Sequence, residues 1–161
     1  MSKKLQALVI GFGSTLRGDD ALGRIACERL RDVVDPRRVK IIDQAAPTPE
    51  LAAEIAAASL AIFLDASVDG SFDEVVTHRL ASAASSHAMA HSLSPEAIVA
   101  LTSRLYGHEP PAFLISMRGK AFDISDRQLS HEAEAACELV IQRTLELLEH
   151  EACNFPQMQV D

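Results

Sequence analysis

The stretch LQALVIGFGSTLRGDD, residues 5–20, decides the fold class, because an apolar run leads directly into a glycine-rich loop. Residues 5–12 are almost continuously apolar, which is typical of a strand buried on both faces of a parallel sheet. The rest of the chain alternates strand and helix patterns. This alternation predicts an α/β protein: a three-layer sandwich with a mostly parallel, twisted sheet of about five strands and helices on both faces.

Four further strands and four helices complete the predicted fold. The strands are expected at residues 39–43, 60–65, 74–80 and 112–117, with the strand over 74–80 less buried than the others. The helices are expected from about residue 20 to Pro36 and over 48–59, 94–107 and 129–150, with Thr48, Ser94 and Ser130 as the N-caps of the last three. We therefore expect one α/β domain over residues 1–150 and an irregular C-terminal tail over 151–161.

The composition excludes several classes of partner. The net charge of −8 argues against nucleic acid and against anionic membranes, since both carry negative charge. No apolar run approaches the roughly 20 residues of a membrane helix, and the short N-terminal run leads into a loop rather than a signal-peptide cleavage site. Three cysteines, far apart and in no CxxC pair, predict reduced thiols. We expect a cytoplasmic protein.

Polar side chains follow the predicted strands where each strand ends. In open α/β sheets, ligands bind beyond the carboxyl ends of the strands, so these side chains are expected near one edge. They are Asp19, Asp20, Asp43, Asp65, His87 and His91.

The loop GFGSTLRG does not suit a phosphate. Leu16 stands where a dinucleotide loop has its third glycine, and no P-loop Lys-Ser/Thr pair is present. Asp19 and Asp20 would also repel a pyrophosphate at the start of the following helix. We therefore reject nucleotide binding.

A metal is the better candidate ligand. Asp20, Asp65 and one histidine provide two oxygens and one nitrogen, a set that suits a borderline divalent cation such as zinc or nickel. Spacing does not separate His87 from His91, and it leaves open that the aspartates only stabilise turns. Asp19 is expected to cap a helix or to orient its neighbour.

Six motifs in the same order give the chain its resemblance to a known family. They are GFGSTLRGDDALG (11–23), TPELA (48–52), FLDA ending in Asp65 and Ala66, HSLSP containing His91, RLYGHEPP (104–111), and LISMRG followed by QLS. Over about residues 5–148 this order resembles the hydrogenase maturation endopeptidases. Two positions depart from the family pattern: Ser14 replaces the usual asparagine, and position 20 is Asp where some members have Glu.

The resemblance implies a function. The family removes a C-terminal peptide from the precursor of the large subunit of a nickel–iron hydrogenase, after that subunit has received its metal. The metal-contacting and catalytic residues carry over to Asp20, Asp65 and His91. The resemblance also implies that the divalent metal is nickel supplied by the substrate, that residues 1–150 are a peptidase domain, and that the precursor is the partner.

Three functional hypotheses follow. The first is a metal-dependent endopeptidase, in which a metal at Asp20, Asp65 and His91 polarises the scissile carbonyl or lowers the pKa of a bound water toward about 7. The second is a non-catalytic checkpoint chaperone that binds the same nickel-loaded precursor without cutting it. The third is an α/β metal-binding module with an unrelated partner. No Ser-His-Asp or Cys-His set is supported.

Overall fold

The computed structural model describes residues 6–67, 75–81, 93–118 and 129–154. The sheet has the strand order β2-β1-β3-β5-β4, and it is parallel except for β4, which runs antiparallel to β5. In chain order the elements are β1 (Ala7–Phe12), η1 (Gly18–Ala21), α1 (Leu22–Arg31), β2 (Val39–Gln44), α2 (Leu51–Ala57), β3 (Leu60–Ser67), β4 (Val75–Leu80), α3 (Pro95–Tyr106), β5 (Ala112–Arg118) and α4 (His131–Asn154). The predicted α/β class is confirmed.

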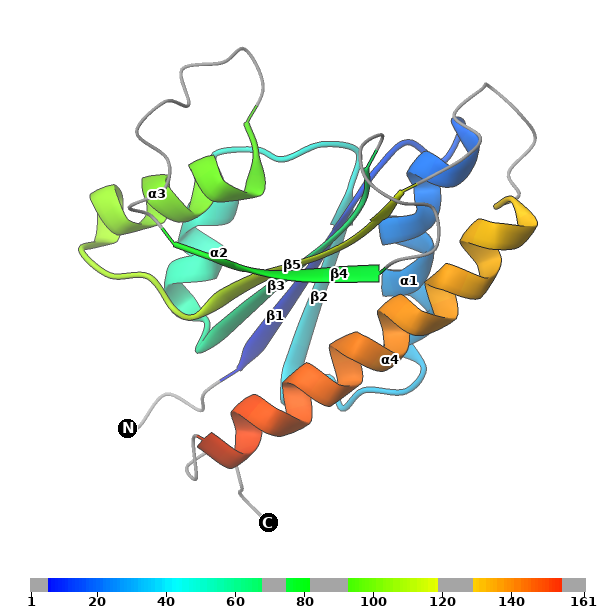
Figure 1. The fold of residues 1–161 in the computed structure, drawn as a ribbon. Helices are drawn as coiled ribbons and strands as arrows, with labels where there is room; N and C mark the ends of the chain where they lie inside the picture. The colour runs from blue at the N-terminus through cyan, green and yellow to red at the C-terminus, as the bar shows by residue number, and fades with distance from the viewer. Residues whose placement is uncertain (1–5, 68–74, 82–92, 119–128, 155–161) are drawn as a thin grey trace.

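Helices cover both faces of the sheet. Figure 1 shows α1 and α4 on one face and α2 and α3 on the other. A hydrophobic core lies on each face of the sheet, and side chains of β1 contribute to both. Ala7 and Val9 pack with α1 and α4, whereas Leu8 and Ile10 pack with α2 and α3. This alternation explains why the strand is apolar at every position, and it confirms the predicted three layers.

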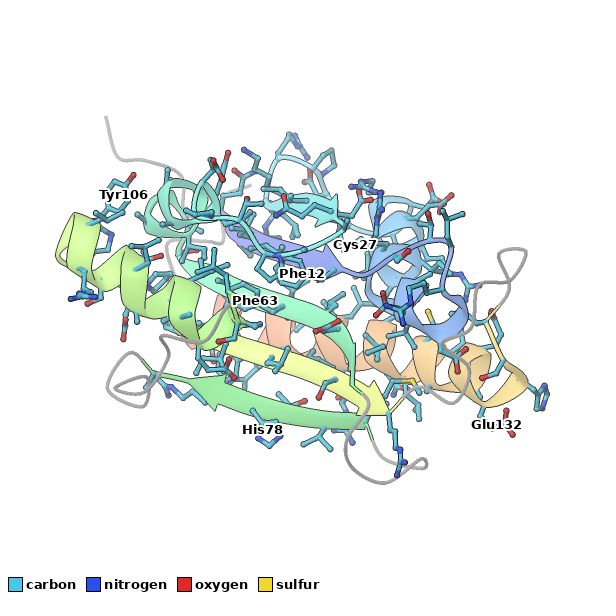
Figure 2. The ribbon with its side chains drawn as sticks, turned by 90° about the horizontal axis from the view of Figure 1, so that it is seen from above. Phe12, Cys27, Phe63, His78, Tyr106 and Glu132 are labelled. Atoms are coloured by element: carbon cyan, nitrogen blue, oxygen red, sulfur yellow. The ribbon has the colours of Figure 1, made fainter. Side chains whose placement is uncertain are left out.

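The edge strands differ from the central ones. All six residues of β1 are buried, whereas β4 exposes Thr77, His78 and Arg79. The antiparallel strand β4 lies at the edge of the sheet, with His78 on its exposed part (Figure 2). The lower burial expected for this strand is therefore confirmed.

The helix boundaries include several corrections. The first helix begins with the 3₁₀ turn η1 rather than with regular α-helix, and α1 ends at Arg31 and not at Pro36. Thr48 does not cap α2, which begins three residues later; its hydroxyl accepts a hydrogen bond from the Gln44 side chain at 3.2 Å. The helix α4 continues to Asn154, so residues 151–154 are helical and not irregular. Residues 155–161 lie outside the described residues, and the division into a domain and a tail stays a prediction.

Two other helix ends agree with the sequence. The Ser94 hydroxyl accepts a hydrogen bond from the Ala97 amide at 3.2 Å and so caps α3, and Gly107 ends that helix with a φ of 74°.

Among the described helices, none combines the length and apolar composition that crossing a bilayer requires.

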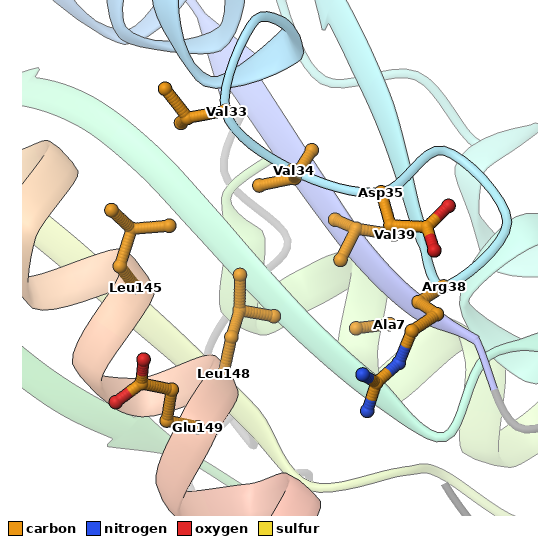
Figure 3. Close-up of a pocket in the computed structure, with 9 residues that line it drawn as sticks. All are labelled: Ala7, Val33, Val34, Asp35, Arg38, Val39, Leu145, Leu148 and Glu149. Carbon is orange, nitrogen blue, oxygen red and sulfur yellow. The ribbon is translucent and has the colours of Figure 1, made fainter. Parts of the chain in front are cut away.

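A pocket of about 250 Å³ lies at the amino ends of the strands (Figure 3). It lies between Ala7 at the start of β1, Val39 at the start of β2, and Leu145 and Leu148 of α4. Ligands in such sheets bind at the opposite ends of the strands. The pocket is therefore separate from the predicted metal site.

Candidate functional site

The loop after β1 carries Asp20 to the carboxyl edge of the sheet. Gly13 has a φ of 134°, a conformation that side chains rarely adopt. A Cβ atom on Gly13 would lie 1.6 Å from the backbone oxygen of Asp20, so the contact is possible only for glycine. The end of β1 and the backbone of Asp20 are thus held against each other.

The same loop orients the Asp20 carboxylate. The Ser14 amide donates a hydrogen bond of 2.7 Å to Oδ2 of Asp20. The Ser14 hydroxyl accepts a hydrogen bond from the Leu16 amide at 3.3 Å, so serine closes a local turn where the family pattern has asparagine. Two successive backbone turns, from Ser14 to Arg17 and from Arg17 to Asp20, complete the loop. The carboxylate is therefore held by its own loop.

Asp65 lies near the carboxyl end of β3, partly buried and in register with Ser116 of β5. Burial raises the pKa of Asp65 to about 7, and the charge of Asp20 adds to this rise, against an opposing hydrogen bond from the Ala66 backbone. The predicted pair of carboxylates is thus brought close enough to interact.

The start of α1 also fits closely against β3. A Cβ atom on Gly23 would lie 2.3 Å from the backbone oxygen of Leu64, the residue before Asp65. On the other face of the sheet, the rings of Phe12 and Phe63 stack with their centroids 6.0 Å apart (Figure 2). The ends of β1 and β3 are therefore packed from both sides, which fixes the positions of the two carboxylates.

Asp19 does not cap its own helix, which was one of its two predicted roles, but binds the N-cap residue of α4. Its side chain is fully buried, and its two oxygens accept hydrogen bonds from the amide and the hydroxyl of Ser130, both at 2.8 Å. The Ser130 hydroxyl accepts a further hydrogen bond from the Ala133 amide at 3.2 Å, as predicted for an N-cap of α4. Sequence reasoning missed the link, since the two residues are 111 positions apart.

Asp43, the remaining strand-end aspartate, has cationic partners. It accepts a hydrogen bond from Arg24 at 3.2 Å and forms a second ion pair with Arg31. Burial alone would raise the pKa of Asp43, but the hydrogen bonds from Arg31 and Arg24 outweigh it and lower the pKa. Asp43 is therefore an ion-pair residue between β2 and α1.

The predicted histidine cannot be placed. His91 and the alternative His87 both lie outside the described residues. Within the described residues, no group of three or more His, Cys, Asp and Glu side chains could hold a metal ion. The structure thus brings Asp20 close to Asp65, and the metal-contacting role of Asp20, Asp65 and His91 stays a prediction.

Two of the three cysteines are buried free thiols, as predicted. Cys27 and Cys137 are fully buried, and burial raises their pKa values to about 12 and about 11. Such thiols are poor nucleophiles and poor metal ligands at neutral pH. The side chain of Cys153 lies outside the described residues.

Comparison with solved structures gives matches along nearly the whole chain. The hydrogenase maturating endopeptidase HybD from Escherichia coli superposes with a TM-score of 0.76 at 23% identity, over 91% of this chain and 94% of that one. The [NiFe] hydrogenase maturation protease HycI from Thermococcus kodakarensis gives a TM-score of 0.70 at 24% identity, over 92% and 95%. The chain has the fold of the hydrogenase maturation endopeptidases.

A third solved structure, from the same organism as the second, has the same fold. The [NiFe] hydrogenase maturation protease HybD from Thermococcus kodakarensis gives a TM-score of 0.68 at 18% identity, over 89% of this chain and 99% of that one. No protein-family model matches the chain, and a search of curated proteins finds no match. In this hydrogenase-endopeptidase fold, Asp20 and Asp65 of the present chain lie together at the carboxyl edge of the sheet.

Proposed function

We propose that the chain is a metal-dependent endopeptidase, which removes the C-terminal extension from the nickel-loaded precursor of a nickel–iron hydrogenase large subunit. One observation carries the proposal: Asp65 is partly buried beside Asp20 at the sheet edge, on a fold shared with hydrogenase maturation endopeptidases. Two adjacent carboxylates repel each other, and a divalent cation would remove that repulsion.

The donor atoms suit a metal that the substrate brings. We assign Asp20, Asp65 and His91 as the residues that contact nickel in the precursor, because carboxylate oxygens and an imidazole nitrogen suit a borderline cation. When bound, the nickel would supply Lewis-acid polarisation of the scissile carbonyl or a more acidic water. The chain itself orients Asp20 through the Ser14 amide.

The state of Asp65 sets the working range of such a site. Because burial raises its pKa to about 7, this side chain carries a proton in mildly acidic solution and loses it near neutral pH. A metal binds the carboxylate and not the acid, so metal contact requires that the proton leaves. We therefore expect precursor cleavage in the cytoplasm near neutral pH, and a fall in kcat/KM as the pH drops below about 7, because the proton on Asp65 of the free protein competes with the nickel.

The test is the intact mass of the precursor after incubation with this protein. Four samples combine nickel-loaded or nickel-free precursor with the wild type or with Asp20→Ala. Asp32→Ala is the matched control, since Asp32 is an exposed aspartate at the end of α1. We expect loss of one discrete C-terminal peptide only with nickel, and only when Asp20 is present.

Other outcomes would replace the proposal. A stable complex with the nickel-loaded precursor and no change in its mass would favour the non-catalytic checkpoint chaperone. Cleavage by Asp20→Ala at the wild-type rate would remove the carboxylate pair from the mechanism. No complex and no cleavage with any hydrogenase precursor would favour a metal-binding module with an unrelated partner.

A further inference from the structure

Asp19 connects the turn η1 to the start of α4, and the proposed active site does not include this contact. It belongs to the four-residue turn η1, directly before Asp20, and its carboxylate reaches the first turn of α4 through Ser130. Within η1 the two aspartates differ in exposure, since Asp19 is fully buried and Asp20 is only partly so. The Asp19 side chain points into the protein and holds the turn in place, while Asp20 lies at the edge of the sheet.

The anchor satisfies a buried carboxyl group. Both carboxylate oxygens of Asp19 accept hydrogen bonds of 2.8 Å from Ser130, one from its amide and one from its hydroxyl. The start of a 24-residue helix adds the positive end of its dipole. A buried carboxylate is tolerated when it is hydrogen-bonded in this way, and it becomes unfavourable when such partners are removed.

The anchoring reaches the next residue through the backbone. One planar peptide bond joins Asp19 to Asp20, so holding Asp19 against Ser130 fixes the position of the Asp20 Cα atom and the direction in which its side chain leaves the turn. The Ser14 amide, 2.7 Å from the Asp20 carboxylate, reports directly whether that carboxylate stays in place.

We propose that Asp19 and Ser130 form a clamp that uses the start of α4 to orient Asp20. Both are positioning residues, because they act through Asp20 and touch no substrate. The inference rests on the proposed function for its catalytic consequence. Its structural part, the orientation of Asp20, can be measured without metal or precursor.

The experiment compares three variants of the full chain by amide hydrogen exchange at Ser14. Asp19→Asn replaces one acceptor oxygen by an amide nitrogen, and Ser130→Ala removes the hydroxyl hydrogen bond but keeps the one from the amide, so both variants weaken the clamp. Ser94→Ala is the matched control, because it removes the same kind of serine cap from α3, away from η1. We expect exchange at the Ser14 amide to rise at least 10-fold in both clamp variants relative to Ser94→Ala. Because the substitutions also change global stability, each rate is measured at the urea concentration that gives all variants the same free energy of unfolding.

Unchanged protection of Ser14 in both clamp variants would overturn the inference, because it would mean that Asp19 only supports α4. Ser130→Thr keeps the hydroxyl and should restore protection. If Asp19→Asn fails to fold, Asp19→Ser takes its place, because it removes both carboxylate oxygens that bind Ser130 and keeps a small polar side chain.

Precursor cleavage supplies the second readout. If the wild type cuts the nickel-loaded precursor, we expect the clamp variants to lose about 10- to 100-fold in kcat with little change in KM, and Ser130→Thr to recover it. Wild-type kcat in Asp19→Asn would overturn the inference. If the wild type does not cut, the proposed function fails, and exchange at Ser14 still decides whether the clamp orients Asp20.

Discussion

The carboxyl ends of β2 and β3 carry one aspartate each, Asp43 and Asp65, and the fold places them in opposite electrostatic environments. Hydrogen bonds from Arg31 and Arg24 overcome the effect of burial and lower the pKa of Asp43. Burial and the charge of Asp20 raise the pKa of Asp65 to about 7. The two residues occupy similar places in the sequence pattern, yet among the described residues only Asp43 has cationic partners.

The difference separates a stabilising carboxylate from a candidate active-site carboxylate. A paired aspartate such as Asp43 contributes to folding, because its charged form is favoured in the native state. A partly buried aspartate beside another carboxylate lowers folding stability at neutral pH, and such groups concentrate at functional sites. The fold tolerates this at the end of β3, where we propose that nickel in the precursor is contacted.

The largest expected effect comes from disturbing the loop that brings Asp20 to Asp65. Gly13→Ala would place a methyl group on the Asp20 backbone oxygen, with a strained φ in addition. We expect a loss of about 4 kcal/mol or more in the free energy of unfolding, measured by urea denaturation. Gly107→Ala is the control, since its φ is 74° and a Cβ there meets nothing within 4 Å, so about 1 kcal/mol is expected. Equal losses in the two variants would contradict the close fit at Gly13.

Replacing the unfavourable carboxylate should stabilise the protein. Asp65→Asn removes the charge without changing the shape of the side chain. Because the pKa of Asp65 is raised from 3.8 to about 7, we expect roughly 2–4 kcal/mol more stability at pH 8, measured by urea denaturation. A loss of stability at that pH would show that the carboxylate has favourable partners, and Asp65 would then resemble Asp43.

The stabilisation by Asp65→Asn should depend on pH, because Asp65 releases its proton at a higher pH in the folded chain than in the unfolded chain. Between about pH 4 and pH 7, folded Asp65 holds a proton that the unfolded chain has released, so its contribution to stability falls as the pH rises through this window. We expect the difference between Asp65→Asn and the wild type to be small below about pH 4 and to reach its full size above about pH 7. A difference that stays constant from pH 4 to pH 8 would contradict the raised pKa.

The smallest effect is expected at the end of β2. Asp43→Asn weakens the two ion pairs with Arg24 and Arg31, whose side chains are 29% and 42% exposed. Since solvent screens partly exposed pairs, we expect a loss of about 1 kcal/mol at pH 8. The lowered pKa of Asp43 means that this contribution disappears as the pH falls below about 4. Stabilisation by Asp43→Asn at pH 8 would remove the contrast with Asp65.

Much of the fold could be predicted from the sequence, because burial on both faces leaves a clear pattern. The apolar runs locate all five strands to within two residues at either end. The antiparallel direction of β4 could not be predicted, since alternation of polar and apolar residues does not encode strand direction. The last turn of α4 was missed because its apolar periodicity ends before the helix does.

The candidate site was predictable only in part. The rule for the carboxyl edge placed Asp20 and Asp65 together, and the raised pKa of Asp65 supports that pairing. The same rule also predicted Asp43 as a candidate site residue. It could not show that Asp43 forms ion pairs, because the two arginines lie 12 and 19 residues away on α1. The Asp19–Ser130 link depends on where α4 packs, which no local pattern records.

The most direct test of the account is precursor cleavage by Asp65→Asn measured beside Asp43→Asn, with the intact mass of the nickel-loaded precursor as the readout. We predict that Asp65→Asn leaves the precursor uncut although it is the more stable protein, and that Asp43→Asn still removes the C-terminal peptide. Cleavage by Asp65→Asn at the wild-type rate would contradict the central claim that this carboxylate is retained for function at the expense of stability.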